Sequence, residues 1–436
     1  MDRGVGLTYR IMAALLSALA VAPLAGCVGS NESLAPESAA VREPAYPLEY
    51  WTPFSGGDNR FMTEMVDRFN AEHPDIQVKQ TNSRLDDYYQ RLRTAILAGN
   101  APDVAIIHTT SLPQFVQNGY IEDLSEPAKR AGLDPSGFTP NIVEAATFDG
   151  RLYSVPLDTH ALVMYYNKTH LAAAGVLDAE GRPIIDEGPA GFEAFLTRIR
   201  EAVPAGVAPM AQPSTRIDSV WLWWSLYNQM EGGGVFYNED ATEAAIDNPK
   251  ALQALEFVYG LYEQGLIPPD INDAFKLFYD GKAAVLITGM WGTGAFENAP
   301  SLDFGVVPVP VLYDRPAVWG DSHTLAIPTR HDMEDGKRDA ILTFARWMVE
   351  HGEMWAAAGH VPSLTKVAEG EALGRMKYRG DYAATADYVA YWPRQAKQWS
   401  MIEVLIREFE RMIYGRQTPA EALRRADSTI DAELRP

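Results

Sequence analysis

The sequence predicts an α/β fold of more than one domain, in which helices cover parallel sheets. Its 436 residues exceed the roughly 150 that one domain usually holds, which indicates about two or three domains. From Tyr46 onward, short apolar strands alternate with amphipathic helices, a pattern typical of parallel α/β sheets. Val104–Ile107 is apolar at every position, as a strand buried on both faces requires.

The first elements follow from hydrophobic spacing and from residues that favour helix starts. Leu48–Thr52 is the first predicted strand and Ile76–Gln80 is the second. Asp58 or Asn59 can cap the helix between them. The apolar stripe of that helix is Phe61, Met65 and Phe69.

Two more helices have clear start signals. Ser83 can cap the next helix, which Gly99 closes. Its apolar stripe is Leu85, Tyr88, Leu92 and Ile96. Thr418-Pro419-Ala420-Glu421 is a capping box with proline at the first helical position, so it predicts the start of the last helix. The buried face of that helix is Leu423, Ala426, Ile430 and Leu434.

Charge and motif content narrow the classes of function. The 58 acidic residues outnumber the 37 basic ones, and the net charge of −21 repels nucleic acids and anionic lipids. The single cysteine permits no internal disulfide and no cysteine-based zinc site. The sequence contains no GxSxG, HExxH, P-loop, GxGxxG or EF-hand motif, and its eight histidines are scattered. The absence of these motifs argues against an enzyme without excluding one, because a pair of catalytic carboxylates needs no such motif. Together with the resemblance given below, it leads us to expect a protein that is not an enzyme, with no catalytic residue, metal or cofactor.

The N-terminus resembles a bacterial lipoprotein signal. Arg3 and Arg10 provide positive charge, and the apolar run Ile11–Ala25 is short for a membrane span. The run leads into Leu24-Ala25-Gly26-Cys27, which resembles a lipobox, where cleavage before the cysteine is followed by lipid modification. We expect a signal peptide at residues 1–26, lipidation at Cys27 and a flexible tether at residues 27–45. An ordinary signal peptide with an incidental cysteine is the alternative.

Five groups of segments carry a further resemblance. They are Trp51–Phe54 with Met65–Val78, Leu92–Ile107 with Gly119–Leu124, Gly150–Pro156 with Met164–Lys168, Phe278–Trp291, and Gly415–Leu423. In this order they resemble the extracellular solute-binding proteins of ABC importers, specifically the sugar-binding group that includes maltose-binding protein. Each motif is weak alone, but together they span most of the chain behind the lipobox.

The resemblance implies a two-lobed, periplasmic-binding-protein-like α/β fold with a hinge and a ligand cleft between the lobes. The chain is then expected to cross between the lobes near residues 157–162, 319–325 and 359–365. The expected N-lobe comprises residues 46–158 and 324–362, and the expected C-lobe comprises residues 159–323 and 363–436.

The resemblance also implies which residues line the cleft. A sugar offers C–H faces to aromatic rings and hydroxyl groups to polar side chains. The aromatic candidates are Trp221, Trp291, Trp319 and Trp392. The polar candidates are Asp58, His108, Thr109, Asp158, Asp321 and His323. His108 stands where the maltose-binding relatives have an aromatic stacking residue, so we expect it to form hydrogen bonds instead.

Some of these candidates have structural alternatives. Asp58 can serve as the helix cap, Asp158 can belong to the hinge, and Trp291 can be a packing residue. Within the Trp221–Trp224 segment we favour Trp221 as the ligand residue and expect at least one other tryptophan in the core.

Together these expectations describe a lipid-anchored receptor on the extracytoplasmic face of the cell membrane. It would be a monomer that captures a sugar, expected to be a di- or oligosaccharide, and delivers it unaltered to the permease subunits of an ABC importer. A receptor for another solute such as a polyamine, and a surface-anchored glycoside hydrolase, are the alternatives.

Overall fold

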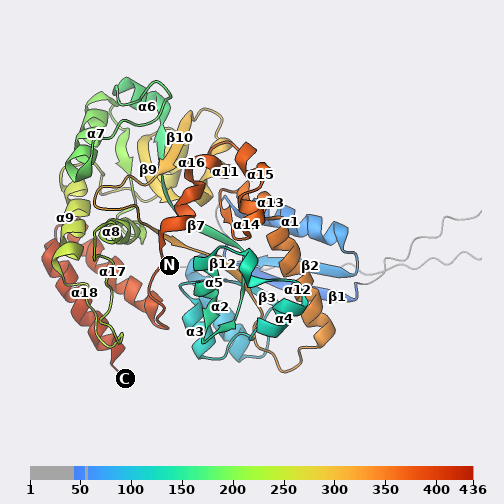
Figure 1. The fold of residues 1–436 in the computed structure, drawn as a ribbon. Helices are drawn as coiled ribbons and strands as arrows, with labels where there is room; N and C mark the ends of the chain where they lie inside the picture. Colours follow the sequence, from blue (N-terminus) through green and yellow to red (C-terminus); the bar gives the residue numbers. More distant parts are fainter. Residues whose placement is uncertain (1–43, 55–56, 436) are drawn as a thin grey trace, which may run out of the picture. The chain divides into compact units, whose positions relative to one another are not determined.

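Two sheets organise the part of the chain that the computed structural model describes, residues 44–54 and 57–435 (Figure 1). The predicted signal peptide, Cys27 and nearly all of the predicted tether lie outside these residues. Among the described residues, no helix has both the length and the apolar character needed to cross a membrane.

The first sheet has the strand order β2-β1-β3-β12-β6. Its strands are β1 (Tyr46–Thr52), β2 (Ile76–Asn82), β3 (Val104–His108), β6 (Val155–Pro156) and β12 (His323–Ala326). β1 pairs in parallel with both β2 and β3, whereas β12 pairs antiparallel with β3 and β6. This sheet therefore needs one strand from a distant part of the chain.

Helices and a short hairpin surround the first sheet, with α1 and α12 beside β1 and β2 in Figure 1. They are α1 (Asn59–Glu72), α2 (Leu85–Leu97), α3 (Leu112–Gln117), α4 (Ser125–Arg130), η1 (Pro135–Gly137), α5 (Pro140–Ala146), β4 (Thr147–Phe148), β5 (Arg151–Leu152), α12 (Asp335–Glu350), α13 (Gly352–Ala356) and α14 (Thr365–Ala368). Their apolar sides build the first core, which draws on residues from Leu48 to Leu157 and from Leu325 to Leu364.

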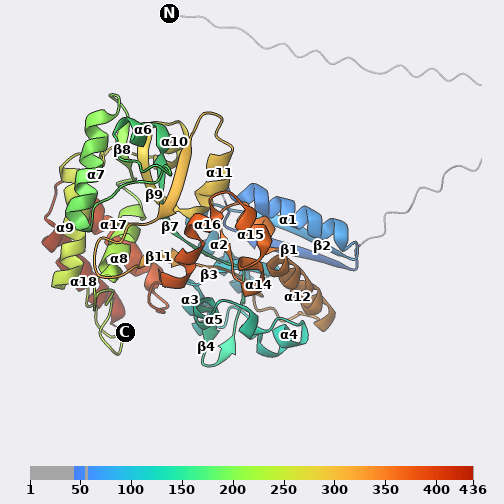
Figure 2. The ribbon, with the colours of Figure 1, turned by 45° about the horizontal axis from the view of Figure 1, so that its top comes forward.

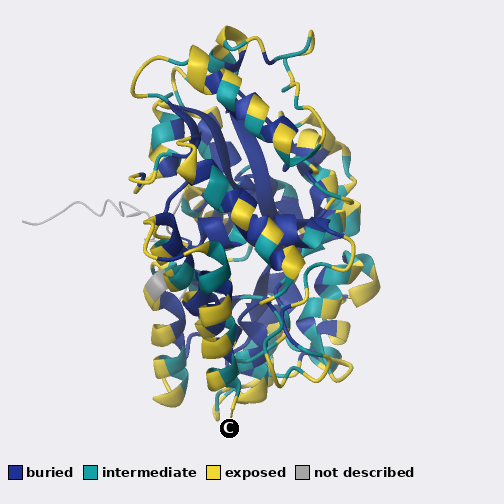
Figure 3. Ribbon diagram, turned by 90° about the vertical axis from the view of Figure 1, so that its left-hand side faces the viewer, coloured by how far each residue is buried: buried dark blue, intermediate teal, exposed yellow. Residues whose placement is uncertain are grey.

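The second sheet has β7 as its central strand. Its strands are β7 (Asp158–Asn167), β8 (Ala208–Ala211), β9 (Ala283–Gly289), β10 (Phe304–Pro308), β11 (Val318–Asp321), β13 (Val361–Pro362) and β14 (Val389–Ala390). All ten residues of β7 are buried, because β9, β10, β11 and β13 all pair with it. In Figure 3 the sheet strands are dark blue, whereas the helices carry exposed bands on one side.

Four helices of this second part, α8, α9, α17 and α18, pack against one another on the side of the C-terminus in Figure 2. They are α6 (Lys168–Ala173), α7 (Gly188–Ala202), α8 (Asp218–Gln229), α9 (Pro249–Glu263), α10 (Ala274–Tyr279), η2 (Met290–Gly292), α11 (Thr293–Glu297), α15 (Glu371–Arg375), α16 (Arg379–Tyr382), η3 (Ala383–Tyr388), α17 (Gln398–Ile413) and α18 (Pro419–Leu434). The second core spans residues from Ala161 to Val318, includes Trp319 and Val361, and ends at Ile430.

The local predictions have mixed outcomes. The capping box of α18 is confirmed, because the Thr418 side chain accepts the Glu421 N–H and the Glu421 carboxylate accepts the Thr418 N–H. The prediction that Ser83 caps α2 is wrong. Ser83 N–H still continues the first sheet by donating to Thr52, and Arg84 occupies the cap position.

Candidate ligand-binding site

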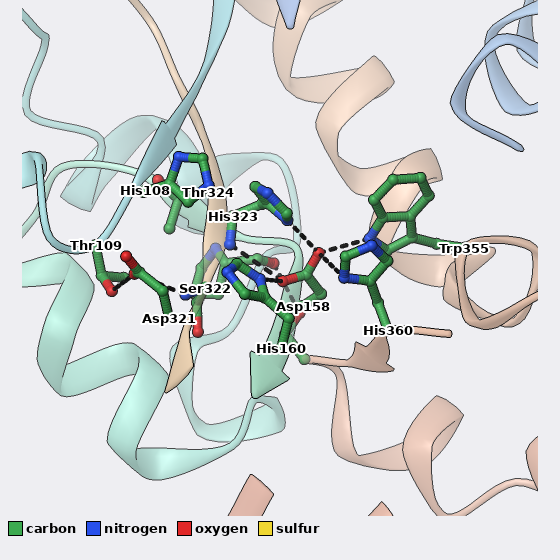
Figure 4. Close-up of polar contacts among 12 residues, drawn as sticks. His108, Thr109, Asp158, His160, Asp321, Ser322, His323, Thr324, Trp355 and His360 are labelled. Atoms are coloured by element: carbon green, nitrogen blue, oxygen red, sulfur yellow. Dashed lines mark hydrogen bonds and ion pairs between the residues drawn. The ribbon is translucent and has the colours of Figure 1, made fainter. Parts of the chain in front are cut away.

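The site lies where the chain passes between the two sheets, as Figure 4 shows. One residue separates β6 of the first sheet from β7 of the second, and Ser322 alone separates β11 from β12. The third segment, β13, pairs with the first residues of β7. Because β11 pairs with β7 on residues 160 and 161, all three crossing segments are neighbours.

Asp158 is the polar centre of this junction. Its Oδ1 lies 3.1 Å from His160 Nδ1 and accepts the backbone N–H of His323 at 3.1 Å. Its Oδ2 lies 2.7 Å from His323 Nδ1 and accepts the indole N–H of Trp355 at 2.5 Å. Burial alone would raise the pKa of Asp158, but the imidazoles around it, His323 first, hold that pKa well below its usual value. Asp158 is therefore an ionised carboxylate with no exposed surface.

Histidines from four segments surround this carboxylate: His108, His160, His323 and His360. We call Asp158, His160, His323 and His360 the junction cluster. Burial lowers the pKa of both His108 and His360 well below the ordinary value, so these two rings are neutral. Burial also opposes protonation of His323, but the attraction of Asp158 raises its pKa above the ordinary value.

His360 lies in a stacked, enclosed position. Its ring is 4.3 Å from the Trp355 ring at an interplanar angle of 5°. Its Nε2 lies 3.9 Å from Asp58 Oδ2, and neither ring nitrogen has a hydrogen-bond partner among the described residues.

Asp58 occupies the N-cap position of α1 through its backbone, but its side chain takes no part in capping. It precedes α1 but its side chain accepts no hydrogen bond from the first turn, and its Oδ1 is buried without a partner. Burial raises the pKa of Asp58 above its usual value. The predicted position of Asp58 at the start of α1 is therefore confirmed, but its carboxylate does not form the cap and lies 3.9 Å from His360 Nε2.

Three tryptophans form an aromatic wall beside the junction cluster. The Trp221 and Trp319 rings stack with 3.9 Å between centroids, and Trp291 meets Trp221 edge-on at 5.9 Å. The Trp291 ring also meets His160 edge-on at 5.6 Å. It folds over Gly289, where any side chain would collide with the indole at 1.9 Å.

Two of the indole N–H groups in this aromatic wall make no hydrogen bond within the described residues. Trp221 Nε1 and Trp319 Nε1 are buried and have no hydrogen-bond partner within the described structure. The neighbouring Trp223 and Trp224 differ, since their N–H groups donate to the carbonyls of Ala251 and Ala390. Both of these rings belong to the second core, which confirms the prediction that at least one other tryptophan of this segment is a core residue.

Hydroxyl and carboxylate groups complete the site. Asp321 accepts the hydroxyls of Thr109 and Thr110, the latter at 2.6 Å, and so links β11 to the loop after β3. Ser322 Oγ lies 2.9 Å from the Tyr391 hydroxyl. His108 Nδ1 lies 2.6 Å from the hydroxyl of Tyr89.

Trp392 is the expected aromatic residue that lies elsewhere. It is buried in the second core, where it stacks on Trp224 at 4.6 Å and meets Phe236 edge-on. The adjacent Tyr391 reaches the junction in its place, one position away in the sequence. We therefore assign Trp392 to packing.

Sequence reasoning missed two residues of the junction, His360 and Trp355. It placed the aromatic residue of the 391–392 pair at Trp392, one position away from Tyr391. The histidines are far apart in the chain, so no spacing motif marks them, although each predicted crossing contains one.

Comparisons with known proteins find a matching family. The profile of the family described as bacterial extracellular solute-binding protein matches residues 55–355. The maltotriose-binding protein of Pyrococcus abyssi is 21% identical over 323 residues, which cover 73% of this chain and 66% of that protein. The chain spans less than two thirds of the length of the first curated relatives that it matches.

Solved structures share the two-lobed fold. An ABC substrate-binding protein from Listeria monocytogenes, in complex with cycloalternan, has a TM-score of 0.76 and 23% identity, and the match covers 89% of this chain and 98% of that one. UgpB from Mycobacterium tuberculosis, in complex with glycerophosphocholine, has a TM-score of 0.77 and 16% identity, with the same coverage of both chains. At these identities the likeness concerns the fold.

Proposed function

Because the chain belongs to the bacterial extracellular solute-binding proteins, we propose that it is the receptor of an ABC importer that captures a sugar between its two lobes. The sugar is a di- or oligosaccharide, which the receptor passes unaltered to permease subunits in the membrane. The maltotriose specificity named for one relative and the cycloalternan bound in one structural neighbour support this ligand class.

The observation that carries the proposal is the aromatic wall with its unpartnered N–H groups. Aromatic rings cover the C–H faces of a sugar, and their N–H groups need acceptors when buried. Trp221 and Trp319 each have such an N–H without a partner within the described residues. Sugar hydroxyls can accept these hydrogen bonds, while Asp321 and Thr109 can exchange their mutual bond for bonds to the ligand.

The expected site residues divide into two groups by position. Trp221, Trp291, Trp319, His108, Thr109 and Asp321 are the proposed ligand contacts. Asp58, Asp158 and His323 lie behind them, and the Asp158 carboxylate already receives three side-chain nitrogens. We assign these three residues to shaping the junction rather than to direct contact.

Family membership indicates an extracytoplasmic location. The lipobox supports attachment of the receptor to the outer face of the cell membrane through Cys27. In this arrangement the receptor acts as a tethered monomer close to its permease. Labelling cells with a radioactive fatty acid tests the anchor, and a chain with Cys27→Ser should lose the label.

Thermal unfolding with a panel of solutes tests the ligand class. Maltotriose and longer neutral oligosaccharides should raise the unfolding temperature, because a ligand at 100 times its Kd adds about 2.7 kcal/mol of stability. Spermidine and glycerophosphocholine serve as the cationic and phosphodiester comparisons. A shift with spermidine alone would contradict the sugar assignment, and recovery of shortened oligosaccharides by chromatography would indicate a hydrolase.

A further inference from the structure

The junction cluster has the composition and burial of a metal site (Figure 4). Each crossing contributes to it: Asp158 and His160 come from β7, His323 from β12, and His360 from the residue before β13. All four side chains are buried, and one ligand atom from each lies within 4.8 Å of the others. This arrangement does not depend on the sugar proposal, because none of the tryptophans of the aromatic wall belongs to the junction cluster, although Trp291 contacts His160.

His360 provides a second, independent observation that points to a ligand. It is 1% exposed, and neither of its ring nitrogens has a hydrogen-bond partner within the described residues. An imidazole nitrogen that makes no hydrogen bond can offer its lone pair to a metal ion. Buried polar atoms of this kind normally bond to something. The Nδ1 atom lies 3.4 Å from Asp158 Oδ2, on the side where the other two imidazoles also approach that carboxylate.

We propose that the junction cluster binds one divalent transition-metal ion, with zinc as the best match, through three imidazole nitrogens and one carboxylate oxygen. Zinc favours four such ligands in a tetrahedron with bonds of about 2.0–2.2 Å, which sets neighbouring ligand atoms about 3.3 Å apart. The His323 and His360 nitrogens lie 2.7 and 3.4 Å from Asp158 Oδ2, and the His160 nitrogen lies 3.1 Å from Asp158 Oδ1. The four ligand atoms lie within 4.8 Å of one another, so the side chains must move closer together to surround a zinc ion.

The surroundings match those of bound metal ligands. A histidine that binds a metal usually directs its second nitrogen to a carboxylate or carbonyl, which orients the ring. His360 Nε2 lies 3.9 Å from Asp58 Oδ2, and the remaining Asp58 oxygen has no partner within the described structure. The Trp355 ring stacks on His360 and donates its N–H to Asp158, so one residue orients two ligands.

Metal binding would join all three crossing segments at one point. Since the ligands are dispersed in the unfolded chain, the ion binds the folded form better and stabilises it. A metal ion would also explain why the buried carboxylate of Asp158 is approached by three imidazoles.

Metal titration of the purified protein, with any affinity tag removed and after dialysis against EDTA, tests the proposal. One Zn²⁺ per chain should bind in isothermal titration calorimetry, and Co²⁺ should give the strong visible absorption of a four-coordinate ion. His360→Gln and His323→Gln should each weaken Zn²⁺ binding at least about tenfold. His331→Gln is the matched control, because this exposed histidine lies outside the cluster.

Absence of stoichiometric Zn²⁺ binding would overturn the proposal, and so would binding that survives both substitutions in the cluster. Circular dichroism identifies variants that fold. If His360→Gln and His323→Gln both fail to fold, the test is the visible absorption of the unsubstituted protein with Co²⁺. Absorption typical of a four-coordinate ion supports the site, and its absence rejects the site. Asp58→Asn, which leaves all four ligands in place, should weaken binding by about 10-fold to 100-fold.

Discussion

Individual tryptophans in this protein differ in how their polar atoms are used. Trp223 and Trp224 donate their N–H groups to backbone carbonyls inside the second core. Trp221 and Trp319 do not, although they lie nearby and stack on each other. The two pairs of rings therefore differ in whether their N–H groups have hydrogen-bond partners within the described residues, and the sequence alone does not reveal this difference.

Replacement of Trp291 by alanine should weaken oligosaccharide binding at least tenfold, because the variant loses a ring that lies partly exposed beside His160. Tenfold corresponds to about 1.4 kcal/mol, a modest share of what a buried aromatic ring contributes. Calorimetry with the oligosaccharide that gives the largest thermal shift provides the measurement.

Trp399→Ala is the control for this experiment, since Trp399 is 37% exposed on α17 and lies outside the aromatic wall. It should bind the sugar as the parent does. Unchanged affinity in Trp291→Ala, with its fold intact, would reject the assigned role of Trp291.

Among the elements, the crossing before β13 is the most constrained by its backbone. Gly359 has φ +130°, and a Cβ atom there would lie 1.9 Å from the carbonyl oxygen of Met290. This close approach places His360 next to Asp158 and η2 next to the crossing. Only a residue without a side chain fits at this point.

Gly359→Ala should therefore destabilise the protein by at least about 2 kcal/mol, through strain and displacement of the backbone. Urea unfolding provides the measurement. Gly374→Ala, in the exposed helix α15 with nothing within 4 Å of the added Cβ, is the matched control. It should change stability by no more than about 1 kcal/mol, in the stabilising direction. Equal stability of Gly359→Ala and the parent would contradict this prediction.

Periodicity and capping signals predicted the elements with local causes. The apolar tetrad Val104–Ile107 is buried in β3, and the capping box begins α18. The prediction that Ser83 caps α2 failed because the Ser83 N–H donates to the Thr52 carbonyl and so continues the pairing of β2 with β1. The residues next to Ser83 in the sequence do not reveal this contact. The sequence indicated Asp158 and His323 of the junction cluster but not His360, because the pairing of β13 with β7 brings residues 158 and 360 together.

At the scale of the whole molecule, the resemblance correctly indicated the two-lobed fold. The lobe boundaries that it implied remain predictions. The two hydrophobic cores also divide the chain, and their boundary lies near the third predicted crossing. Val361 packs in the second core, whereas Leu364 packs in the first. The crossing near these residues therefore alternates between cores within a few positions.

The net charge of −21 leads to a prediction about ligand capture. A field of this size steers cations but exerts little force on a neutral sugar. Raising NaCl from 50 to 500 mM should therefore change the association rate of the oligosaccharide by less than about twofold. Stopped-flow tryptophan fluorescence provides the measurement. A rate that falls tenfold with salt would instead point to a cationic ligand.

The order in which the chain visits its two cores has a consequence during biosynthesis. β1, β2 and β3 leave the ribosome early, but their sheet partner β12 does not begin until His323. The first core also needs the segment from Leu325 to Leu364, so most of the polypeptide must be made before this core can close. An export machinery that accepts only unfolded chains gains a long interval in which to engage this one.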